Sequence, residues 1–202
     1  MRVAPREMMR MHVEALFTRD AAGDLACINE PAGGGGPARK GLALPLAPAP
    51  YEDIIGRLGA TKTWAGPAFT FPERLPAAAG GVVEVSSAPV LEPLLSAWIP
   101  DLMTCQPMVA LVLDGKAVSI CASVRITGDA HEAGVDTAPA YRGRGYAAQV
   151  ATAWASAVRD IGRIPFYSTS WTNTASRSVA RKLSLIHFGN DLRVTESREV
   201  AA

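Results

Sequence analysis

The sequence predicts an α+β fold, and its second half carries the prediction. From about residue 103 onward, short apolar runs alternate with turn signals, which is the pattern of β-strands. Two segments instead repeat their apolar residues every three or four positions, as amphipathic helices do. Three strands come first, and later strands alternate with the helices. This order, β-β-β-α-β-α-β, predicts a sheet with helices packed on it.

The first 102 residues are expected to form a separate α/β extension that packs on residues 103–202. Paired apolar runs around a glycine turn predict a hairpin, and a stretch rich in Pro, Gly and Ala predicts an irregular loop. Apolar side chains at helical spacing predict two short helices. The expected segments are a hairpin within 1–30, a loop over 31–50, helices over 51–59 and 90–99, and an irregular stretch over 61–90.

Three strands in meander order open the second half. Each is a mostly apolar run, and a two-residue turn signal that contains glycine separates it from the next. The expected strands are 108–113, 117–126 and 130–137, with turns at Asp114-Gly115 and Gly128-Asp129.

A long helix, a strand, a second helix and a last strand are expected to follow. The long helix, from about residue 144 to 160, places Tyr146, Val150, Trp154 and Val158 on one face beside a row of alanines. A glycine two residues after it fits a helix C-cap. The remaining elements are a strand over 164–170, a helix over 174–183 and a strand over 186–194.

Composition excludes several classes of function. The net charge is +1 and the sequence has no basic stretch, which speaks against a nucleic-acid partner. No run approaches the roughly 20 apolar residues that span a membrane. The three cysteines have neither an even number nor the paired spacing of a disulfide or zinc framework. The start lacks the apolar region of a signal peptide, so we expect a cytoplasmic protein. Because the cysteines lack the paired spacing of a zinc site, we also expect that the protein binds no metal.

The junction before the long helix has the composition of a phosphate-binding loop. Gly143 and Gly145 let the backbone approach a ligand closely, and a helix start offers unpaired N–H groups with a partial positive charge. Arg142 and Arg144 add full charges, and Pro139 stands in the lead-in. The alternative is an ordinary strand-to-helix turn with solvated arginines.

Two spaced motifs decide between these interpretations. The loop reads Arg142-x-x-Gly145-x-Ala147, and Asn173-x-x-Ser176 follows after the next strand. Together they resemble the acetyl-CoA-binding motifs of the GNAT superfamily of N-acetyltransferases. The resemblance covers about residues 103–195, and it implies a mixed central sheet flanked by helices. Taken alone, Asn173 is also a good helix N-cap.

The resemblance implies acetyl-CoA as a co-substrate that lies between two splayed strands. The third strand of the meander would bind pantetheine through its backbone, and the loop would bind the pyrophosphate. The residues expected to contact acetyl-CoA are Val135, Thr137, Arg142, Gly143, Arg144, Gly145, Tyr146, Ala147, Asn173 and Ser176.

Glu132 is the expected catalytic base, because superfamily members often place a glutamate on this strand. Counted back from the loop, the usual position falls nearer His131. Since strand faces alternate, that offset matters unless a bulge corrects it. His131 and Asp136 therefore stay as alternatives.

The general acid is harder to identify, because the sequence departs from the family at two places. The superfamily tyrosine seven residues after the Asn is Ala180 here, and the usual Gly-Phe after the helix is Ser184-Leu185. Tyr167 is the expected substitute, and His187 is a weaker one. A thiolate with a reference pKa near 8.5 can also leave without full protonation.

The function expected from the resemblance is direct transfer of an acetyl group from acetyl-CoA to an amine in a ternary complex. The partner is then a small-molecule or peptide amine, and a homodimer stays open. Two alternatives are a non-catalytic acyl-CoA-binding or regulatory module and a binder of another phosphate ligand. Four aromatic side chains of the first half are expected either to wall the acceptor pocket or to lie in the core: Trp64, Phe69, Phe71 and Trp98.

Overall fold

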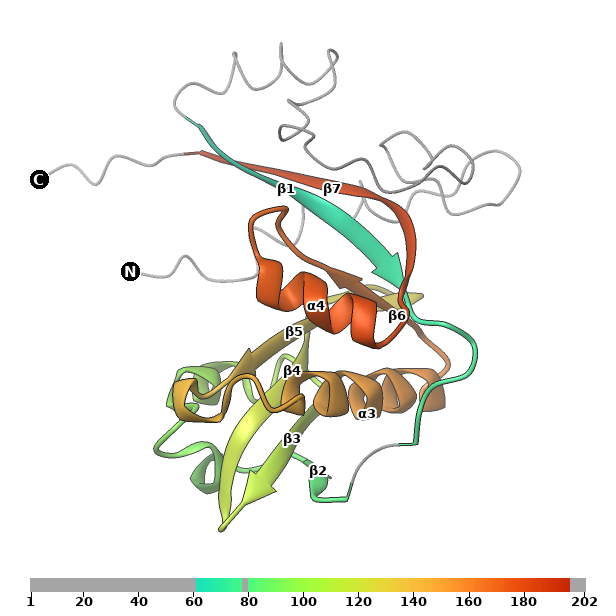
Figure 1. The fold of residues 1–202 in the computed structure, drawn as a ribbon. Helices are drawn as coiled ribbons and strands as arrows, with labels where there is room; N and C mark the ends of the chain where they lie inside the picture. Colours follow the sequence, from blue (N-terminus) through green and yellow to red (C-terminus); the bar gives the residue numbers. More distant parts are fainter. Residues whose placement is uncertain (1–60, 78–79, 197–202) are drawn as a thin grey trace, which may run out of the picture. The chain divides into compact units, whose positions relative to one another are not determined.

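The computed structural model of the chain describes residues 61–77 and 80–196 (Figure 1). The hairpin expected within residues 1–30, the loop over 31–50 and the helix over 51–59 lie outside the described residues. Within the described part, two compact units are distinguished. The larger one holds residues 69–167 and 175–186, and the smaller one includes residues 61–68, 168–174 and 187–196.

Seven strands and two α-helices make up the regular structure of the described residues, together with three short 3-10 helices. The hydrogen-bonded order of the strands is β2-β3-β4-β5-β6-β1-β7. Neighbours from β2 to β5 are antiparallel, whereas β5 and β6 are parallel, so the sheet is mixed. The α+β class expected from the sequence is confirmed.

The larger unit is built around the strand meander that the sequence predicts. The expected strands agree closely with the observed ones, and β2 adds a short antiparallel neighbour to β3. The first turn has Asp114 and Gly115 at φ of 49° and 74°, the left-handed pair that a tight hairpin requires. The strands are β2 (Val82–Glu84), β3 (Met108–Leu113), β4 (Lys116–Ile126), β5 (Ala130–Thr137) and β6 (Ile164–Ser168).

One face of this sheet is covered by helix α3 (Tyr146–Asp160) (Figure 1). Three residues of its predicted stripe, Val150, Trp154 and Val158, are fully enclosed, and the fourth, Tyr146, is half-buried. The alanines beside them allow close packing on β3, β4 and β5. Helix α4 (Thr174–Lys182) contributes Ala180 to the same apolar cluster.

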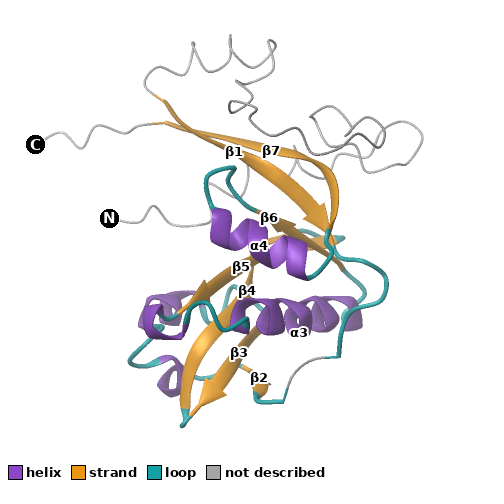
Figure 2. Cartoon of the chain, viewed as in Figure 1, coloured by secondary structure: helices purple, strands orange, loops and turns teal. Residues whose placement is uncertain are grey.

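The other face carries a second apolar cluster beneath two 3-10 helices, η1 (Ala88–Leu91) and η2 (Ser96–Asp101) (Figure 2). The single helix expected over 90–99 is therefore wrong. Pro93 has no N–H to donate and its ring restricts the residue before it to extended backbone. Glu92 accordingly has a ψ of 144°, which ends η1. Leu91 and Leu95 still point into the core, as the spacing indicated.

The smaller unit contains most of the neighbouring strands β1 (Thr61–Thr70) and β7 (Ile186–Glu196). The last strand was expected, but the irregular stretch expected over 61–90 is wrong at its start, because β1 is regular despite Pro67. Gly66 explains how: a side chain there would run into the carbonyl oxygen of Thr169, and the Pro67 carbonyl accepts the Thr169 amide at 3.2 Å. Pro67 thus keeps a backbone hydrogen bond to the neighbouring segment through its carbonyl.

Candidate active site

Strands β5 and β6 separate partway along their length. Their pairing runs from Ala130 with Ile164 to Glu132 with Phe166, whereas β5 stays paired with β4 as far as Thr137. Within the described strands, the β6-facing edge of β5 beyond Glu132 therefore has backbone groups outside the ladder. The splaying that the sequence analysis expected is confirmed, and such groups can bind an extended ligand.

The end of β5 leads into the glycine loop and the start of α3. A 3-10 turn, η3 (Pro139–Tyr141), is followed by Gly143 and Gly145 at φ of 77° and 82°. Gly145 is the N-cap of α3 and has no side-chain oxygen to satisfy the first-turn amides. The first amide that donates to the helix backbone is that of Ala148, to the Gly145 carbonyl at 3.2 Å. The loop thus presents helix-start N–H groups.

Both arginines of the loop interact with the loop itself. Arg142 donates from Nε to the carbonyl oxygen of Thr137 at 2.9 Å, and its Nη2 lies 3.9 Å from Oδ1 of Asp136. Arg144 donates to the carbonyl oxygen of Ala140 at 3.2 Å, and its guanidinium lies 5.4 Å from the ring centroid of Tyr141. These contacts brace the loop, and both side chains are exposed.

A third cation at this loop comes from α4. An ideal Cβ built on Gly145 would lie 2.5 Å from Nζ of Lys182. The same construction on Gly143 meets no heavy atom within 4 Å. Lys182 falls within the helix predicted over 174–183, but helical spacing indicates only the face of a residue and not the partner of that face, so the sequence assigns it no role.

Tyr167 and Ser176 are brought together by β6 and α4. The Tyr167 hydroxyl lies 2.6 Å from Oγ of Ser176, and the ring packs against Phe71 in the core. Burial raises the pKa of the Tyr167 phenol to about 12, although the hydrogen bond with Ser176 acts in the opposite direction. Ala180 lies in the same apolar cluster.

Glu132 forms a buried ion pair with Arg125 of β4. The β4–β5 register shifts at this point, between Ser123 and Arg125, so a bulge brings the two side chains together. Glu132 alternates with His131 along β5, and the two belong to opposite faces.

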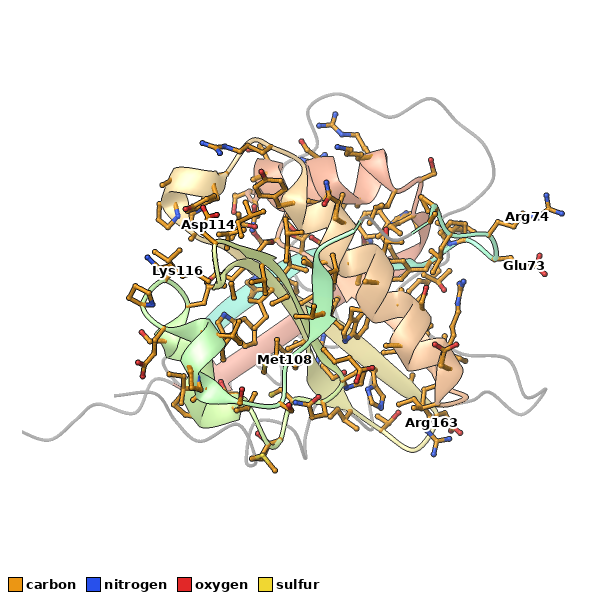
Figure 3. All side chains as sticks on the ribbon, turned by 90° about the horizontal axis from the view of Figure 1, so that it is seen from below. Glu73, Arg74, Met108, Asp114, Lys116 and Arg163 are labelled. Atoms are coloured by element: carbon orange, nitrogen blue, oxygen red, sulfur yellow. The ribbon has the colours of Figure 1, made fainter. Side chains whose placement is uncertain are left out.

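His131 lies among the residues under α3. Its Nδ1 is 2.9 Å from Oγ of Ser123, and that oxygen accepts a hydrogen bond from Nε1 of Trp154 at 3.1 Å. Burial, followed by the positive charge of Arg163, lowers the pKa of His131. Arg163 is at the far end of the sheet from Asp114 of the β3–β4 turn and Lys116 at the start of β4 (Figure 3). This histidine connects two strands and a helix.

The remaining candidates have local partners. Asp136 accepts the amide of Thr137 at 2.7 Å. Asn173 belongs to the smaller unit, where its backbone N–H donates to the Ser170 carbonyl oxygen at 3.1 Å. His187, also of the smaller unit, has Nε2 3.3 Å from Oδ1 of Asn190.

Two aromatic residues of the first half have clear positions. Phe71 is buried against Trp154, so it belongs to the core. Trp98 is half-buried and lies against Gly134, where an added Cβ would come within 3.1 Å of its ring and 2.1 Å of Val124. Gly134 has no role among the sequence-based predictions, although an isolated glycine inside a strand is a known sign of close approach.

Metal binding and membrane crossing are two further possibilities for the described part of the chain. It contains no cluster of three or more His, Cys, Asp or Glu that could hold a metal ion. Over the same residues, no helix has the length and apolar character needed to cross a membrane.

Comparison with known proteins links this geometry to one family. Residues 109–189 match the family model described as GNAT acetyltransferase. A search of curated proteins returned no match.

Solved structures agree with the family model at the level of the fold. A protein assigned to the GNAT acetyltransferase family from Novosphingobium aromaticivorans has 18% identity and a TM-score of 0.54, over 69% of each chain. A GCN5-related N-acetyltransferase-like protein from Streptococcus suis has 16% identity and a TM-score of 0.53, over 73% of this chain and 69% of its own. A GNAT-family acetyltransferase from Colwellia psychrerythraea has 14% identity and a TM-score of 0.53, over 72% and 60%.

These identities support a shared fold and no more, whereas the family model adds agreement in sequence over the splayed strands, the glycine loop and both helices. Residues 109–189 thus match a GNAT acetyltransferase domain in sequence, within a chain whose fold is that of solved GNAT-family acetyltransferases.

Proposed function

We propose that the protein transfers the acetyl group of acetyl-CoA directly to an amine acceptor while both are bound in a ternary complex. The observation that carries the proposal is the separation of β5 from β6, which ends at an uncapped helix start with two left-handed glycines. An extended pantetheine fits the first feature and a pyrophosphate fits the second.

The donor is proposed to lie along the unpaired edge of β5. Pantetheine would exchange hydrogen bonds with the backbone near Val135 and Thr137. The amides of residues 143–147 would bind the pyrophosphate, and Arg142 and Arg144 would hold the loop in shape. Asn173 and Ser176 remain proposed contacts from the second motif.

The reaction is proposed as attack of a neutral amine nitrogen on the thioester carbonyl carbon. The C–S bond then breaks, CoA leaves as its thiolate, and the nitrogen loses a proton. A backbone N–H of β5 near the carbonyl oxygen would stabilise the developing negative charge. A primary amine has a reference pKa of about 10.4 and is mostly protonated at neutral pH, so the site must supply a route for its proton.

Glu132 is proposed to accept that proton through water, with Arg125 holding the carboxylate. His131 is less suited, because it is engaged with Ser123 beneath α3. Tyr167 is proposed as a hydrogen-bond donor to the departing sulfur. With its pKa raised to about 12, its phenol stays protonated, and full transfer to a thiolate of reference pKa about 8.5 would be uphill.

The test is calorimetric titration with acetyl-CoA combined with an assay of CoA release over a panel of polyamines, amino sugars, amino acids and peptide N-termini. We expect acetyl-CoA to bind and at least one amine class to accelerate CoA release. A chain that neither binds acetyl-CoA nor releases CoA would contradict the proposal.

One alternative has structural support. Ala180 in the place of the family tyrosine, and Glu132 tied to Arg125, are also compatible with a non-catalytic acyl-CoA-binding or regulatory module. Binding of acetyl-CoA without turnover on any acceptor would favour the module. Stabilisation by nucleotides but not by acetyl-CoA would favour a different phosphate ligand.

The proposed setting is the cytoplasm, with an amine acceptor as partner and a homodimer left open. Two described cysteines, Cys105 and Cys121, are buried as free thiols. Free buried thiols are typical of a reducing compartment, which supports this setting.

A further inference from the structure

The backbone groups of β5 alternate in direction along the strand. The N–H of Ala138, directly after the strand, donates to the Val118 carbonyl oxygen of β4 at 2.9 Å. Just before the strand, the carbonyl oxygen of Asp129 accepts from the N–H of Ile164 on β6 at 2.9 Å. Even-numbered residues of β5 therefore bond toward β4, and odd-numbered residues turn their N–H and C=O groups toward β6.

Two odd-numbered residues lie well past the end of the β5–β6 ladder. The ladder ends with the pair of Glu132 and Phe166, so Val135 and Thr137 face the open side of β5. An extended ligand can pair with either residue, and the two registers differ by two strand positions, about 6.5–7 Å. A thioester carbonyl is much smaller than that distance. The register of the donor therefore decides whether its reacting atoms lie near Glu132, the proposed base.

Thr137 already has internal partners for the groups that face the open side. Its N–H donates to Oδ1 of Asp136 at 2.7 Å, and its carbonyl oxygen accepts from Nε of Arg142 at 2.9 Å. Its hydroxyl lies 2.8 Å from Oγ of Ser119, which donates to the Asp136 carbonyl oxygen at 3.1 Å and so holds both residues against β4. Hydrogen bonds to charged groups are the stronger kind, so a ligand competes poorly for the Thr137 backbone.

We propose that Asp136 fixes the register of the donor on β5, because its carboxylate caps Thr137 and an extended CoA thioester then pairs with Val135. The proposal rests on the proposed function and narrows its donor contacts. Within residues 61–77 and 80–196, no side chain bonds to the N–H or C=O of Val135. Asp136 is a positioning residue, since it acts through the Thr137 backbone and touches no reacting atom.

The experiment compares Asp136→Ala with Asp136→Asn in the full-length protein. Alanine removes the cap, whereas the Asn side-chain oxygen can accept the same N–H, so Asp136→Asn removes the charge alone. Glu84→Ala, which removes an exposed carboxylate from the edge strand β2, controls for overall charge. Pantetheine and acetyl-pantetheine are the ligands, because they carry no phosphate that would respond to a lost negative charge.

Asp136→Ala should bind pantetheine more tightly and turn over more slowly. Calorimetry should show a Kd about three- to tenfold lower, since one more backbone N–H is open to the ligand. With acetyl-pantetheine and a saturating amine from the acceptor panel, kcat and KM should fall by that same factor. The value of kcat/KM should then stay unchanged, because the second register holds the donor out of reach of the acceptor. Asp136→Asn and Glu84→Ala should match the wild type.

Amide hydrogen exchange observes the cap directly. In the wild type, the Thr137 N–H should be protected before any ligand is added, and pantetheine should add protection at Val135. In Asp136→Ala, the Thr137 N–H should exchange rapidly until pantetheine is added.

Three results overturn the role of Asp136. They are weaker pantetheine binding in Asp136→Ala, equal changes in Asp136→Ala and Asp136→Asn, and a Thr137 N–H that exchanges rapidly in the wild type. If the wild type binds neither pantetheine nor acetyl-CoA, the proposed function fails and the register fails with it. Wild-type binding of acetyl-CoA with an unprotected Thr137 rejects the register alone.

Discussion

At the scale of single residues, the glycine loop depends on backbone conformations that other residues adopt at a cost. Gly143, Gly145 and Gly162 all have φ between 72° and 82°. They differ in what surrounds them: Gly145 lies beside Lys182 at the start of α3, whereas Gly162 follows the end of α3 with open space around it. Strain and ligand binding can therefore be separated by comparing the two ends of one helix.

Gly145→Ala is expected to reduce both stability and donor binding. A left-handed conformation costs a residue with Cβ about 1–2 kcal/mol, so the free energy of unfolding should fall by that amount. The new methyl group also displaces Lys182, and the affinity for CoA should fall severalfold. Urea unfolding and calorimetry measure the two effects. Gly162→Ala is the matched control, with a similar loss of stability and an unchanged Kd for CoA; equal loss of affinity in both variants would contradict the loop assignment.

Glu132→Gln is expected to destabilise the fold as well as to affect turnover. Glu132 and Arg125 are 2% and 6% exposed, so removing one of the two charges breaks a buried ion pair. Loss of one partner of a buried pair costs on the order of 3 kcal/mol.

The double variant Arg125→Met with Glu132→Leu should recover most of that stability without recovering turnover. Thermal unfolding and CoA-release rates, measured where all variants are folded, test this. Full turnover in either folded variant would remove Glu132 from the mechanism.

At the scale of elements, a buried polar chain joins two strands to the long helix. Oγ of Ser123 on β4 accepts a hydrogen bond from Nε1 of Trp154 on α3, donates to the Pro107 carbonyl oxygen at 3.4 Å and lies 2.9 Å from Nδ1 of His131 on β5. The hydrogen bonds among these side chains are satisfied when His131 is neutral, whereas protonation of His131 would place a positive charge beneath α3.

The pH dependence of stability follows from the lowered pKa of His131. The folded-state pKa lies below the unfolded value of about 6.5, so the unfolded chain binds more protons in the acid range. The contribution of neutral His131 to the free energy of unfolding is complete above about pH 6.5 and is lost as the pH falls through the folded-state pKa. Urea unfolding between pH 7.5 and 5 should show this decline, and the decline should be smaller in His131→Gln. A wild-type curve parallel to that of the variant would exclude His131 as its source.

Elements were predicted well where local pattern and local chemistry agree. The β3–β4 hairpin follows from Asp114-Gly115, and α3 follows from its periodic stripe. Two of the failures were at prolines. Pro93 divides an apolar periodic segment into two 3-10 helices, and Pro67 is accepted in β1 because Gly66 allows the backbone of residue 169 to come close. In the second case the decisive neighbour is about a hundred residues away.

At the scale of the whole molecule, the proposed donor site connects β5, the glycine loop, α3 and α4 of the larger unit. A ligand that binds only the folded chain should therefore raise its melting temperature. Acetyl-CoA at 100 times its Kd should stabilise the fold by about 2.7 kcal/mol, which corresponds to roughly 5–10 °C for a chain of this size.

Thermal unfolding with acetyl-CoA, pantetheine and ADP tests the expected shift. Acetyl-CoA should give the largest shift, because it alone occupies both the β5 edge and the loop. A larger shift with ADP than with acetyl-CoA would contradict a site built for a thioester.

The sequence alone determined the order of strands and helices in the second half, the two turn glycines and the loop with its motif, since each depends on residues a few positions apart. Only the tertiary structure decided which side chains meet: Glu132 with Arg125, Tyr167 with Ser176, and Lys182 with Gly145. Periodicity fixes the face on which a side chain lies, whereas its partner depends on how faces pack together. The ammonium at the start of α3 is such a partner, supplied by a helix that lies beyond a whole intervening strand in the sequence.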